Sequence, residues 1–508
     1  MGDAADKSAH SVDSRKVHCI ALGLVILGIA ARLRMYLADR SLWRDEAALA
    51  LNIIHRSFFG LLRPLDNEQG APIGFLMLQK LSVSLLGGGE YALRLVPLLA
   101  SILALLLFWP LCRRVIGGAG GLVALGILAL GFRQWEYADQ NKQYSTDVLV
   151  AVVLMRLAAW ALPRDNPSPR RLIVLAAVGA MAIWFSHAAV FVLAGVGCLA
   201  LYRQSNWTGK TAGILAIVAA VWLGSFAVDY AVCLRPLAHD PYMVQFWTAA
   251  HGFAPAPTSP SALMWLYNYF LELPDNPGSL SFGTPALGPV PSVAMLLYFL
   301  GLFALWRGDK GVLFLALMPI VFGLAASMAH LYPFRYRLAL FTAPLVAVPI
   351  GAGFAALFQQ TGIAKATAIV ALLMLAIEPA KTTMDYLRRP PLLREMRPAV
   401  AYIAAHRQSG DICYIYPLCE YGFEYYQERQ GLSNLPVTIG SQDVAGWEAY
   451  AVELRKLSGH RVWVIFEDTA DHDGVNEQQM ALHILDEMGR RVLEFQPFGE
   501  YVACYDLR

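Results

Sequence analysis

The chain has 508 residues, of which 57% are hydrophobic and only 15% are charged. Soluble domains have roughly 45–50% apolar and 25% charged residues, and the mean hydropathy of this chain is +0.47, so a water-soluble globular fold is excluded. The 40 basic and 38 acidic side chains nearly cancel, for a net charge of +2. No global field attracts nucleic acid, and the composition indicates an integral membrane protein.

Apolar runs long enough to cross the roughly 30 Å hydrocarbon core of a bilayer recur along most of the chain. The first run resembles the core of a signal peptide, but no small-residue cleavage site follows it, so we expect it to remain as a helix. We predict an α-helical polytopic membrane protein with about eleven transmembrane helices. The runs lie near residues 17–37, 91–111, 119–132, 143–162, 171–186, 188–202, 212–231, 290–306, 311–330, 338–356 and 366–380.

The orientation follows from the short connectors, because Lys and Arg are enriched on the cytoplasmic side of membrane proteins. If the chain starts inside with Arg15 and Lys16, every second connector should be basic, and this is the pattern found. The basic connectors contain Arg113 and Arg114, Arg164 with Arg170 and Arg171, Arg203 with Lys210, Arg307 with Lys310, and Lys365. The pattern predicts an N-terminus inside and a C-terminal region outside.

Three segments should then lie outside. Residues 38–90 include a moderately apolar stretch, Ile73–Leu86, that we expect to be a helix on the membrane surface. Residues 233–289 are rich in Pro, Gly and aromatic residues, including Pro274–Gly278, and a loop of this length is usually functional or a lid. The third is the C-terminal region. We therefore divide the chain into a transmembrane domain, 1–390, and an extracytoplasmic domain, 391–508.

The C-terminal region has the pattern of a small α/β domain. A helix over Leu393–His406, strands at 412–416, 461–466 and 501–505, and a helix over 477–488 predict a mainly parallel sheet flanked by helices. No glycine-rich loop follows a strand there, so we expect no nucleotide site. Cys413 and Cys419 could form a disulfide outside the cytoplasm or remain free thiols.

The first candidate functional residues are Asp45 and Glu46, just after the first predicted span. Acidic residues are common in the first turn of a helix, so the pair could simply start a solvated helix. Alternatively, a carboxylate that is partly desolvated near the bilayer has a raised pKa and can act as a general base. The sequence leaves both interpretations open.

A second polar cluster occupies the short external connector at residues 133–147. Its length exceeds what a turn between two helices needs, and Tyr137, Asn141 and Tyr144 share one helical face, which suggests that the next helix starts outside the membrane. Asp147 should then lie just inside the membrane, where an ionisable group is costly and usually functional.

A third cluster, Tyr332-Pro-Phe-Arg335-Tyr-Arg337, directly precedes the tenth predicted span. Arginines at an outer surface could merely extend toward water. The positive-inside bias disfavours them there, however, and a guanidinium group suits phosphate, so we expect a site for a lipid-linked phosphate. His187, between two predicted spans, is more often structural than catalytic in this setting.

Together these three clusters resemble the GT-C class of membrane glycosyltransferases, in its bacterial branch similar to protein O-mannosyltransferases and lipid A aminoarabinose transferases. The opening of the C-terminal region, residues 394–426, resembles the soluble tail of that branch. The resemblance implies transfer of one sugar from a polyprenyl-phosphate donor to a hydroxyl of an envelope glycan, lipid or protein. The transfer would take place at the periplasmic face of a bacterial cytoplasmic membrane, with inversion.

The resemblance also implies roles for individual residues. Asp45 would take the acceptor proton with Glu46 beside it, Asp139 or Asp147 would be the second external carboxylate, and Lys142, Arg335 and Arg337 would hold the donor phosphate. Further pocket candidates are Tyr144, His187 and Tyr332. The chain has Gly70-Ala71-Pro72-Ile73 where the aminoarabinose transferases carry a lysine next to prolines, which leaves the donor sugar open.

Cofactors follow from the same chemistry. A lipid-phosphate leaving group needs neither a nucleotide pocket nor an obligatory metal, because cationic side chains can balance its charge. Some members of the class bind a divalent cation, for which Asp45 with Asp139 or Asp147 would be the ligands.

The main alternative function is that of a transporter or lipid flippase. That function predicts internal repeats and broken helices in matching halves, which the sequence does not show. A non-catalytic scaffold would leave Asp45, Glu46, Arg335 and Arg337 without a role.

Overall fold

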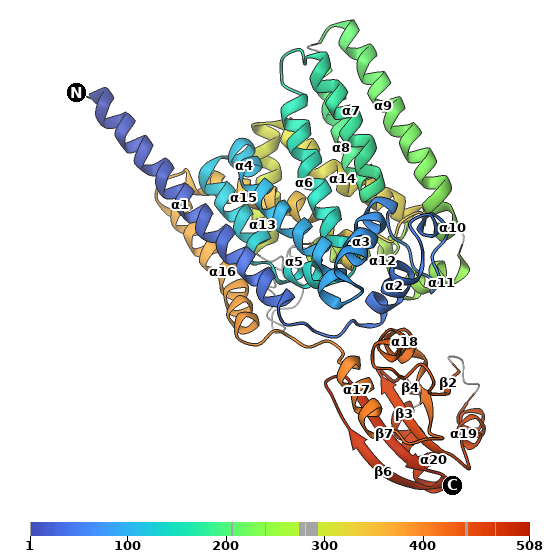
Figure 1. Ribbon diagram of the computed structural model, residues 1–508. Coiled ribbons are helices and arrows are strands. Elements are labelled where there is room, and N and C mark those ends of the chain that lie inside the picture. Colours follow the sequence, from blue (N-terminus) through green and yellow to red (C-terminus); the bar gives the residue numbers. More distant parts are fainter. Residues whose placement is uncertain are drawn as a thin grey trace.

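The computed structural model describes residues 2–204, 207–238, 240–273, 280, 293–441, 446–472 and 474–508. A helical bundle forms the larger part, and a smaller unit built around a β-sheet lies at one end of it (Figure 1). The bundle helices are α1 (Gly2–Tyr36), α2 (Arg44–His55), α3 (Ile73–Leu86), α4 (Glu90–Leu130), α5 (Phe132–Glu136), α6 (Tyr144–Ala161), α7 (Pro169–Phe185), α8 (Ala189–Arg203), α9 (Gly209–Asp229), α10 (Arg235–Ala238), α11 (Pro241–Ala249), α12 (Pro260–Glu272), α13 (Val293–Arg307), α14 (Lys310–Met328), α15 (Ala343–Phe358) and α16 (Ile363–Arg388).

Among the described residues, each of the predicted apolar runs lies mainly on helices, so the mostly helical membrane architecture is confirmed. Within the described residues, seven helical segments are long and apolar enough to cross a membrane, and α3, α8 and α13 are shorter apolar helices. The number of spans therefore stays a prediction. Residues 274–279 and 281–289 of the second predicted external segment, with the Pro274–Gly278 motif, lie outside the described residues; α10, α11 and α12 form the rest of it.

Helix α4 contains two of the predicted spans and folds back on itself between them. Gly117 has a positive φ of 80° inside the 41-residue helix, a conformation that glycine adopts without the steric cost of a side chain. Leu105, before this point, and Ala129, after it, both contact Gly28 of α1. The two halves therefore run along the same helix, and Arg113 and Arg114 lie near the reversal.

Helix α15 is the centre of the bundle. It is almost entirely buried, and it contacts α13 so closely that a Cβ added at Gly301 would lie 1.8 Å from the carbonyl oxygen of Pro349. Small residues such as Gly301 allow the two helices to approach this closely. In lipid the hydrophobic effect does not drive helices together, so the resulting van der Waals contact stabilises the pair. Helices α1 and α16 pack along the opposite edge of the bundle from α9 (Figure 1).

The C-terminal unit has a five-stranded sheet in the order β2-β1-β3-β7-β6. Strand β1 is parallel to β2 and β3, but β7 is antiparallel to both β3 and β6. The prediction of a mainly parallel sheet is thus wrong, because the turn at Gly499 (φ 77°) joins β6 and β7 as a hairpin and returns β7 beside β3. The elements are α17 (Met396–His406), β1 (Ile412–Ile415), α18 (Glu420–Arg429), β2 (Val437–Ile439), α19 (Trp447–Arg455), β3 (Arg461–Glu467), β4 (Asp471–His472), β5 (Val475–Asn476), α20 (Glu477–Met488), β6 (Arg490–Phe495) and β7 (Glu500–Asp506). Cys413 and Cys419 are free thiols.

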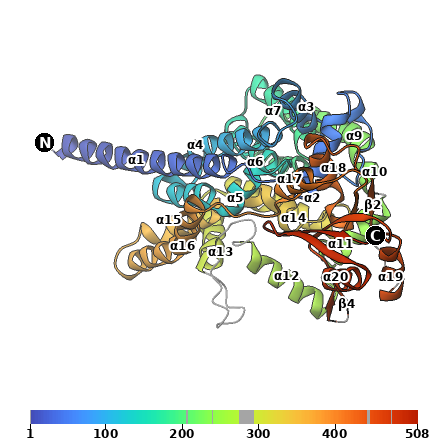
Figure 2. The ribbon, with the colours of Figure 1, turned by 60° about the horizontal axis from the view of Figure 1, so that its bottom comes forward.

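The C-terminal unit packs directly on the first predicted external segment, residues 38–90. Leu49 and Ile53 of α2 share one hydrophobic core with Phe423 of α18. The hydroxyl of Tyr426 accepts a hydrogen bond from the backbone N–H of Leu42 at 2.8 Å and donates one to Glu90 at 3.0 Å. This contact fixes the start of α2 and therefore the residues that α2 carries. Figure 2 shows α18 and α2 close together from a second direction.

Candidate active site

The candidate site is built around Asp45, in the first turn of α2. Nη2 of Arg337 donates a hydrogen bond to Oδ2 of Asp45 at 2.5 Å, and the two side chains are 22% and 25% exposed. Lys142, just before α6, also attracts the Asp45 carboxylate, and its Nζ donates to Oε1 of Gln69 at 2.5 Å. One carboxylate thus faces two cations from distant parts of the chain, in a place that solvent or a ligand can reach.

Aromatic side chains surround this charged group. The guanidinium carbon of Arg337 lies 5.3 Å from the ring centre of Trp43 and 5.9 Å from that of Trp247, distances typical of cation–π contacts. Tyr137 and Tyr144 stack edge to face, with ring centres 5.2 Å apart, and both interact electrostatically with Arg337. Such walls lower the local dielectric constant and so strengthen interactions with a bound anion.

The protonation states differ from the sequence-based expectation. Burial alone would raise the pKa of Asp45, but the attraction of Lys142 and Arg337 outweighs it and lowers that pKa below its usual value. The expected raised pKa is therefore wrong for this state of the protein. Burial lowers the pKa of Lys142 to about 8, despite the opposing attraction of Asp45. At neutral pH the group of Asp45, Lys142 and Arg337 carries a net charge of +1, which favours an anion.

Glu46 lies next to Asp45 in sequence but belongs to a different, fully buried set of charges. Its carboxylate accepts hydrogen bonds from Nε and Nη2 of Arg94 at 3.0 and 2.8 Å, and from the backbone N–H of Asn141 at 2.7 Å. Arg94 also donates to the carbonyl oxygens of Arg40 and Ser41, just before α2. We infer that Glu46 positions Asp45 and the loop that carries Lys142, and does not itself react.

Asp139 lies in the same buried charge network. Nε and Nη2 of Arg40 donate hydrogen bonds to Oδ2 of Asp139 at 3.0 and 2.7 Å. Nε of Arg94 lies 3.9 Å from the other carboxylate oxygen, Oδ1. Two groups of candidate metal ligands occur among the described residues, namely His187, Asp229 and Cys233, and Cys419, Glu467 and Glu500. Neither contains Asp45 or Asp139; these two carboxylates bind Arg337 and Arg40 instead, and a cation on that pair stays a prediction.

The polar connector does not start the next helix in the way that its periodicity suggested. Tyr137–Asp139 forms a separate short 3-10 turn, and α6 begins only at Tyr144. The backbone needs this break because Asn141 and Lys142 must face Glu46 and Gln69. Asp147 lies in the first turn of α6, is buried, and interacts with Ser186 and Tyr332. Asp147 thus has other partners than Asp139 and Asp45, although both Asp147 and Asp45 interact electrostatically with Tyr144.

The remaining candidates occupy the edges of this region. Tyr332 packs against Phe191 and donates a hydrogen bond to the carbonyl of Leu338 at 2.9 Å. Nη2 of Arg335 donates to both carboxylate oxygens of Glu272, at 2.9 and 3.2 Å. Arg335 and Arg337 therefore have different partners, and only Arg337 contacts Asp45. Nε2 of His187 is buried without a hydrogen-bond partner.

Several residues of the site were not found from the sequence. Arg40 and Arg94 were missed, although an arginine early in an apolar run, as Arg94 is, signals a buried ionic partner. Gln69 and Trp247 have no local signal, because isolated Gln and Trp residues are common in external loops. Their role follows only from their contacts with Lys142 and Arg337.

Comparisons with known proteins agree with this arrangement at the level of fold. No family model matches the chain, and no curated protein matches it in sequence. The structure of ArnT from Cupriavidus metallidurans bound to undecaprenyl phosphate is similar over 95% of this chain and 98% of that one, with a TM-score of 0.54 and 13% identity. Apo ArnT from the same organism gives a TM-score of 0.51 with 14% identity over the same shares. An Archaeoglobus fulgidus oligosaccharyltransferase, tethered to an acceptor peptide, gives 0.49 with 11% identity over 95% of this chain and 74% of that one. The chain therefore has, over nearly its whole length, the fold of ArnT.

Proposed function

We propose that this protein transfers a single sugar from a polyprenyl-phosphate donor to a hydroxyl acceptor at the outer face of the bacterial cytoplasmic membrane, with inversion. The observation that carries the proposal is Asp45 beside Arg337 and Lys142 in a partly exposed, aromatic-walled site. The likeness to ArnT supports the choice of donor, because one of the ArnT structures has undecaprenyl phosphate bound. The acceptor would be an envelope glycan, lipid or protein.

The reaction divides the work between the carboxylate and the cations. The acceptor oxygen forms a bond to the anomeric carbon, its proton goes to Asp45, and the bond between that carbon and the phosphate oxygen breaks. The leaving polyprenyl phosphate gains negative charge, which Arg337 and Lys142 stabilise. A bound phosphate also competes with Asp45 for these cations, so it raises the basicity of Asp45 when the base is needed.

The direct test is to remove the protein from its cells and measure the polyprenyl-linked lipids by mass spectrometry. We expect a polyprenyl-phosphate sugar to accumulate, since its consumption would stop, and the mass of the sugar would identify the donor. An envelope glycan or lipid that loses the same sugar would identify the acceptor. An unchanged lipid profile would count against the proposed activity.

The two arginines of the third cluster should behave differently. Arg337→Gln should weaken the binding of undecaprenyl phosphate by roughly 10- to 100-fold, the usual worth of a charged hydrogen bond. Arg335→Gln should leave it about unchanged, because Arg335 is held by Glu272. Dissociation constants measured on the purified proteins provide the check, and equal losses in both variants would show that Arg335 also contacts the phosphate.

Donor affinity should decline as the pH rises above about 8. The pKa of Lys142 is lowered to about 8 by burial, so the free protein loses this positive charge as the pH rises through that value. Affinity should fall by up to about tenfold per pH unit, since bound phosphate restores the proton. The donor is a phosphate diester without a second ionisation, so its own charge stays constant over this pH range. Lys142→Met should bind the donor more weakly, and its affinity should not change with pH in this range. If the donor affinity of Lys142→Met still fell as the pH rises, another group would cause the pH dependence.

A further inference from the structure

A second group of reactive side chains lies outside the candidate active site, where α7 and α9 end. His187 follows α7, Asp229 is the last residue of α9, and Cys233 lies in the π-helical turn Tyr230–Leu234 that continues α9. Their potential ligand atoms all lie within 4.8 Å of one another. The proposed sugar transfer uses none of them.

Two members of this group are buried without the partners that they need. Asp229 is fully buried, forms no ion pair with any residue that the structure describes, and has only the Cys233 thiol as a hydrogen-bond partner there. Nε2 of His187 is also buried and unpartnered. Burial of an uncompensated carboxylate costs several kcal/mol or more. Because the potential ligand atoms of His187, Asp229 and Cys233 lie so close together, the unsatisfied carboxylate and imidazole indicate that a positively charged component belongs between them.

The local backbone places Cys233 beside Asp229 and next to the start of α3. Asp229 and Cys233 are four residues apart and so lie on one face of the helix, and π-turns of this kind occur frequently at functional sites. The backbone N–H of Ile73 hydrogen-bonds to the Cys233 sulfur. Ile73 is the first residue of helix α3, so Cys233 lies where the start of α3 meets the turn that continues α9.

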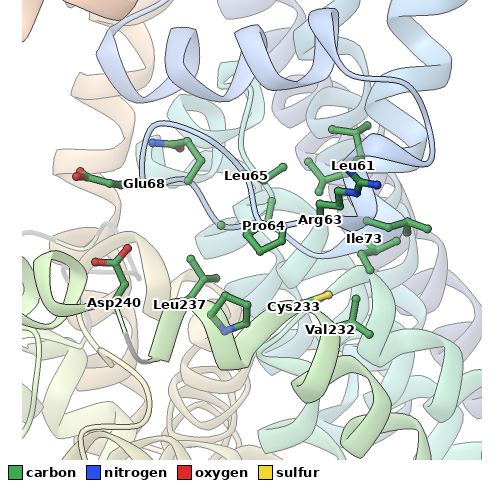
Figure 3. A pocket seen from close by; sticks show the side chains of 16 residues that line it. Leu61, Arg63, Pro64, Leu65, Glu68, Ile73, Val232, Cys233, Leu237 and Asp240 are labelled. Atoms are coloured by element: carbon green, nitrogen blue, oxygen red, sulfur yellow. The ribbon is translucent and has the colours of Figure 1, made fainter.

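A pocket gives access to this group. It lies between residues 61–73 and the end of α9, and Cys233 forms part of its wall next to Ile73 (Figure 3). Glu68, Asp240 and Arg63 also line it, so these three side chains together carry one net negative charge when ionised. A dissolved cation therefore has both an electrostatic attraction to the pocket and a path to the sulfur.

We propose that His187, Asp229 and Cys233 bind one divalent transition-metal ion of the Zn²⁺ type. An imidazole nitrogen, a carboxylate oxygen and a thiolate suit Zn²⁺, whereas Mg²⁺ and Ca²⁺ prefer oxygen ligands only. Metal–ligand bonds of about 2.0–2.3 Å place tetrahedral ligands about 3.3–3.8 Å apart, so small side-chain movements close the site. Binding releases the Cys233 proton, and water from the pocket supplies the fourth ligand. The ion would tie the connection between α7 and α8 to α9 and to the start of α3.

The test uses Co²⁺ as a spectroscopic substitute for Zn²⁺ on the purified full-length protein, after removal of metal with a chelator. We expect about one Co²⁺ per chain, with the thiolate-to-cobalt charge-transfer absorption and the visible bands of a tetrahedral site. Cys233→Ser should abolish the charge-transfer absorption, while Cys198→Ser, a matched change at another partly buried cysteine, should keep it. Absence of bound metal, or an absorption that survives in Cys233→Ser, would overturn the proposal.

A second measurement does not depend on the thiol. Zn²⁺ should raise the melting temperature of the metal-free wild-type protein, because it binds only the folded chain. The nearly isosteric change Asp229→Asn should lower the Zn²⁺ affinity by about tenfold or more, since even changes outside the ligand set cost 10- to 100-fold. Undiminished Zn²⁺ affinity in Asp229→Asn would remove Asp229 from the site and contradict the proposal.

Discussion

Asp45→Asn is expected to lower the rate of sugar transfer by roughly 10²- to 10⁴-fold, the usual contribution of a positioned general base. The amide cannot accept the acceptor proton, but its oxygen can still accept the hydrogen bond from Arg337, so the chain should remain folded. The rate should be measured on the purified protein with the donor lipid that accumulates in cells lacking it. Cells that carry only Asp45→Asn should accumulate the same lipid.

The matched control is Asp66→Asn, the same chemical change in the same external segment. The Asp66 side chain is 72% exposed and pairs with Arg56, away from Arg337. We expect this variant to retain wild-type activity. If Asp45→Asn were folded and fully active, Asp45 could not be the base. A similar loss in both variants would indicate a general effect of the external segment and not catalysis.

Arg94→Met should cause the largest loss of stability. It leaves the Glu46 carboxylate, which is 0% exposed, without its counter-charge, and breaking such a pair typically costs about 3–5 kcal/mol. We expect the melting temperature, followed by tryptophan fluorescence in detergent, to fall by roughly 5–10 °C. Activity should fall as well, because Glu46 also holds the backbone before Lys142 through Asn141.

The double variant Arg94→Met with Glu46→Gln separates charge from packing. Gln removes the unpaired charge and keeps an acceptor for the N–H of Asn141, so we expect most of the lost stability to return. The control Arg164→Met removes the partner of Asp309, where the Arg164 side chain is 74% exposed, and should cost less than about 1 kcal/mol. If the double variant were as unstable as Arg94→Met alone, the buried charge of Glu46 would not be the cause.

Hydrophobic patterning predicted the helices well, since each apolar run follows from residues that are neighbours in sequence. Helix α20 occurs at the predicted residues 477–488, and α6 at 144–161 within the predicted 143–162. The pattern did not predict strand directions, because these depend on pairing between segments that are apart in sequence. Strand β7, for example, lies antiparallel to β3 because it forms a hairpin with β6. A strand's own sequence does not specify the direction of its neighbour.

The candidate site divides in the same way. Short motifs singled out Asp45, Lys142 and Arg337, and the structure brings these three residues together. The same motifs could not separate Asp45 from Glu46, or Arg337 from Arg335, because neighbours in sequence can face opposite sides of one element. Glu46 binds Arg94, which is 48 residues away in sequence, and Arg335 binds Glu272, which is 63 residues away. Whether the pKa of Asp45 is raised or lowered also depends on residues that are distant in sequence, namely Lys142 and Arg337.

The sequence by itself determined that this chain lies in a membrane as a helical bundle with a small α/β unit at its C-terminal end, because burial in lipid acts on local runs of apolar residues. Only the tertiary structure decided which charges meet. Asp45 and Arg337 are separated by 292 residues and Arg40 and Asp139 by 99. In a low-dielectric interior, the free energy of each ionised group depends mainly on the nearest charge in space. That neighbour is set by how the helices pack, and distance along the chain does not reveal it.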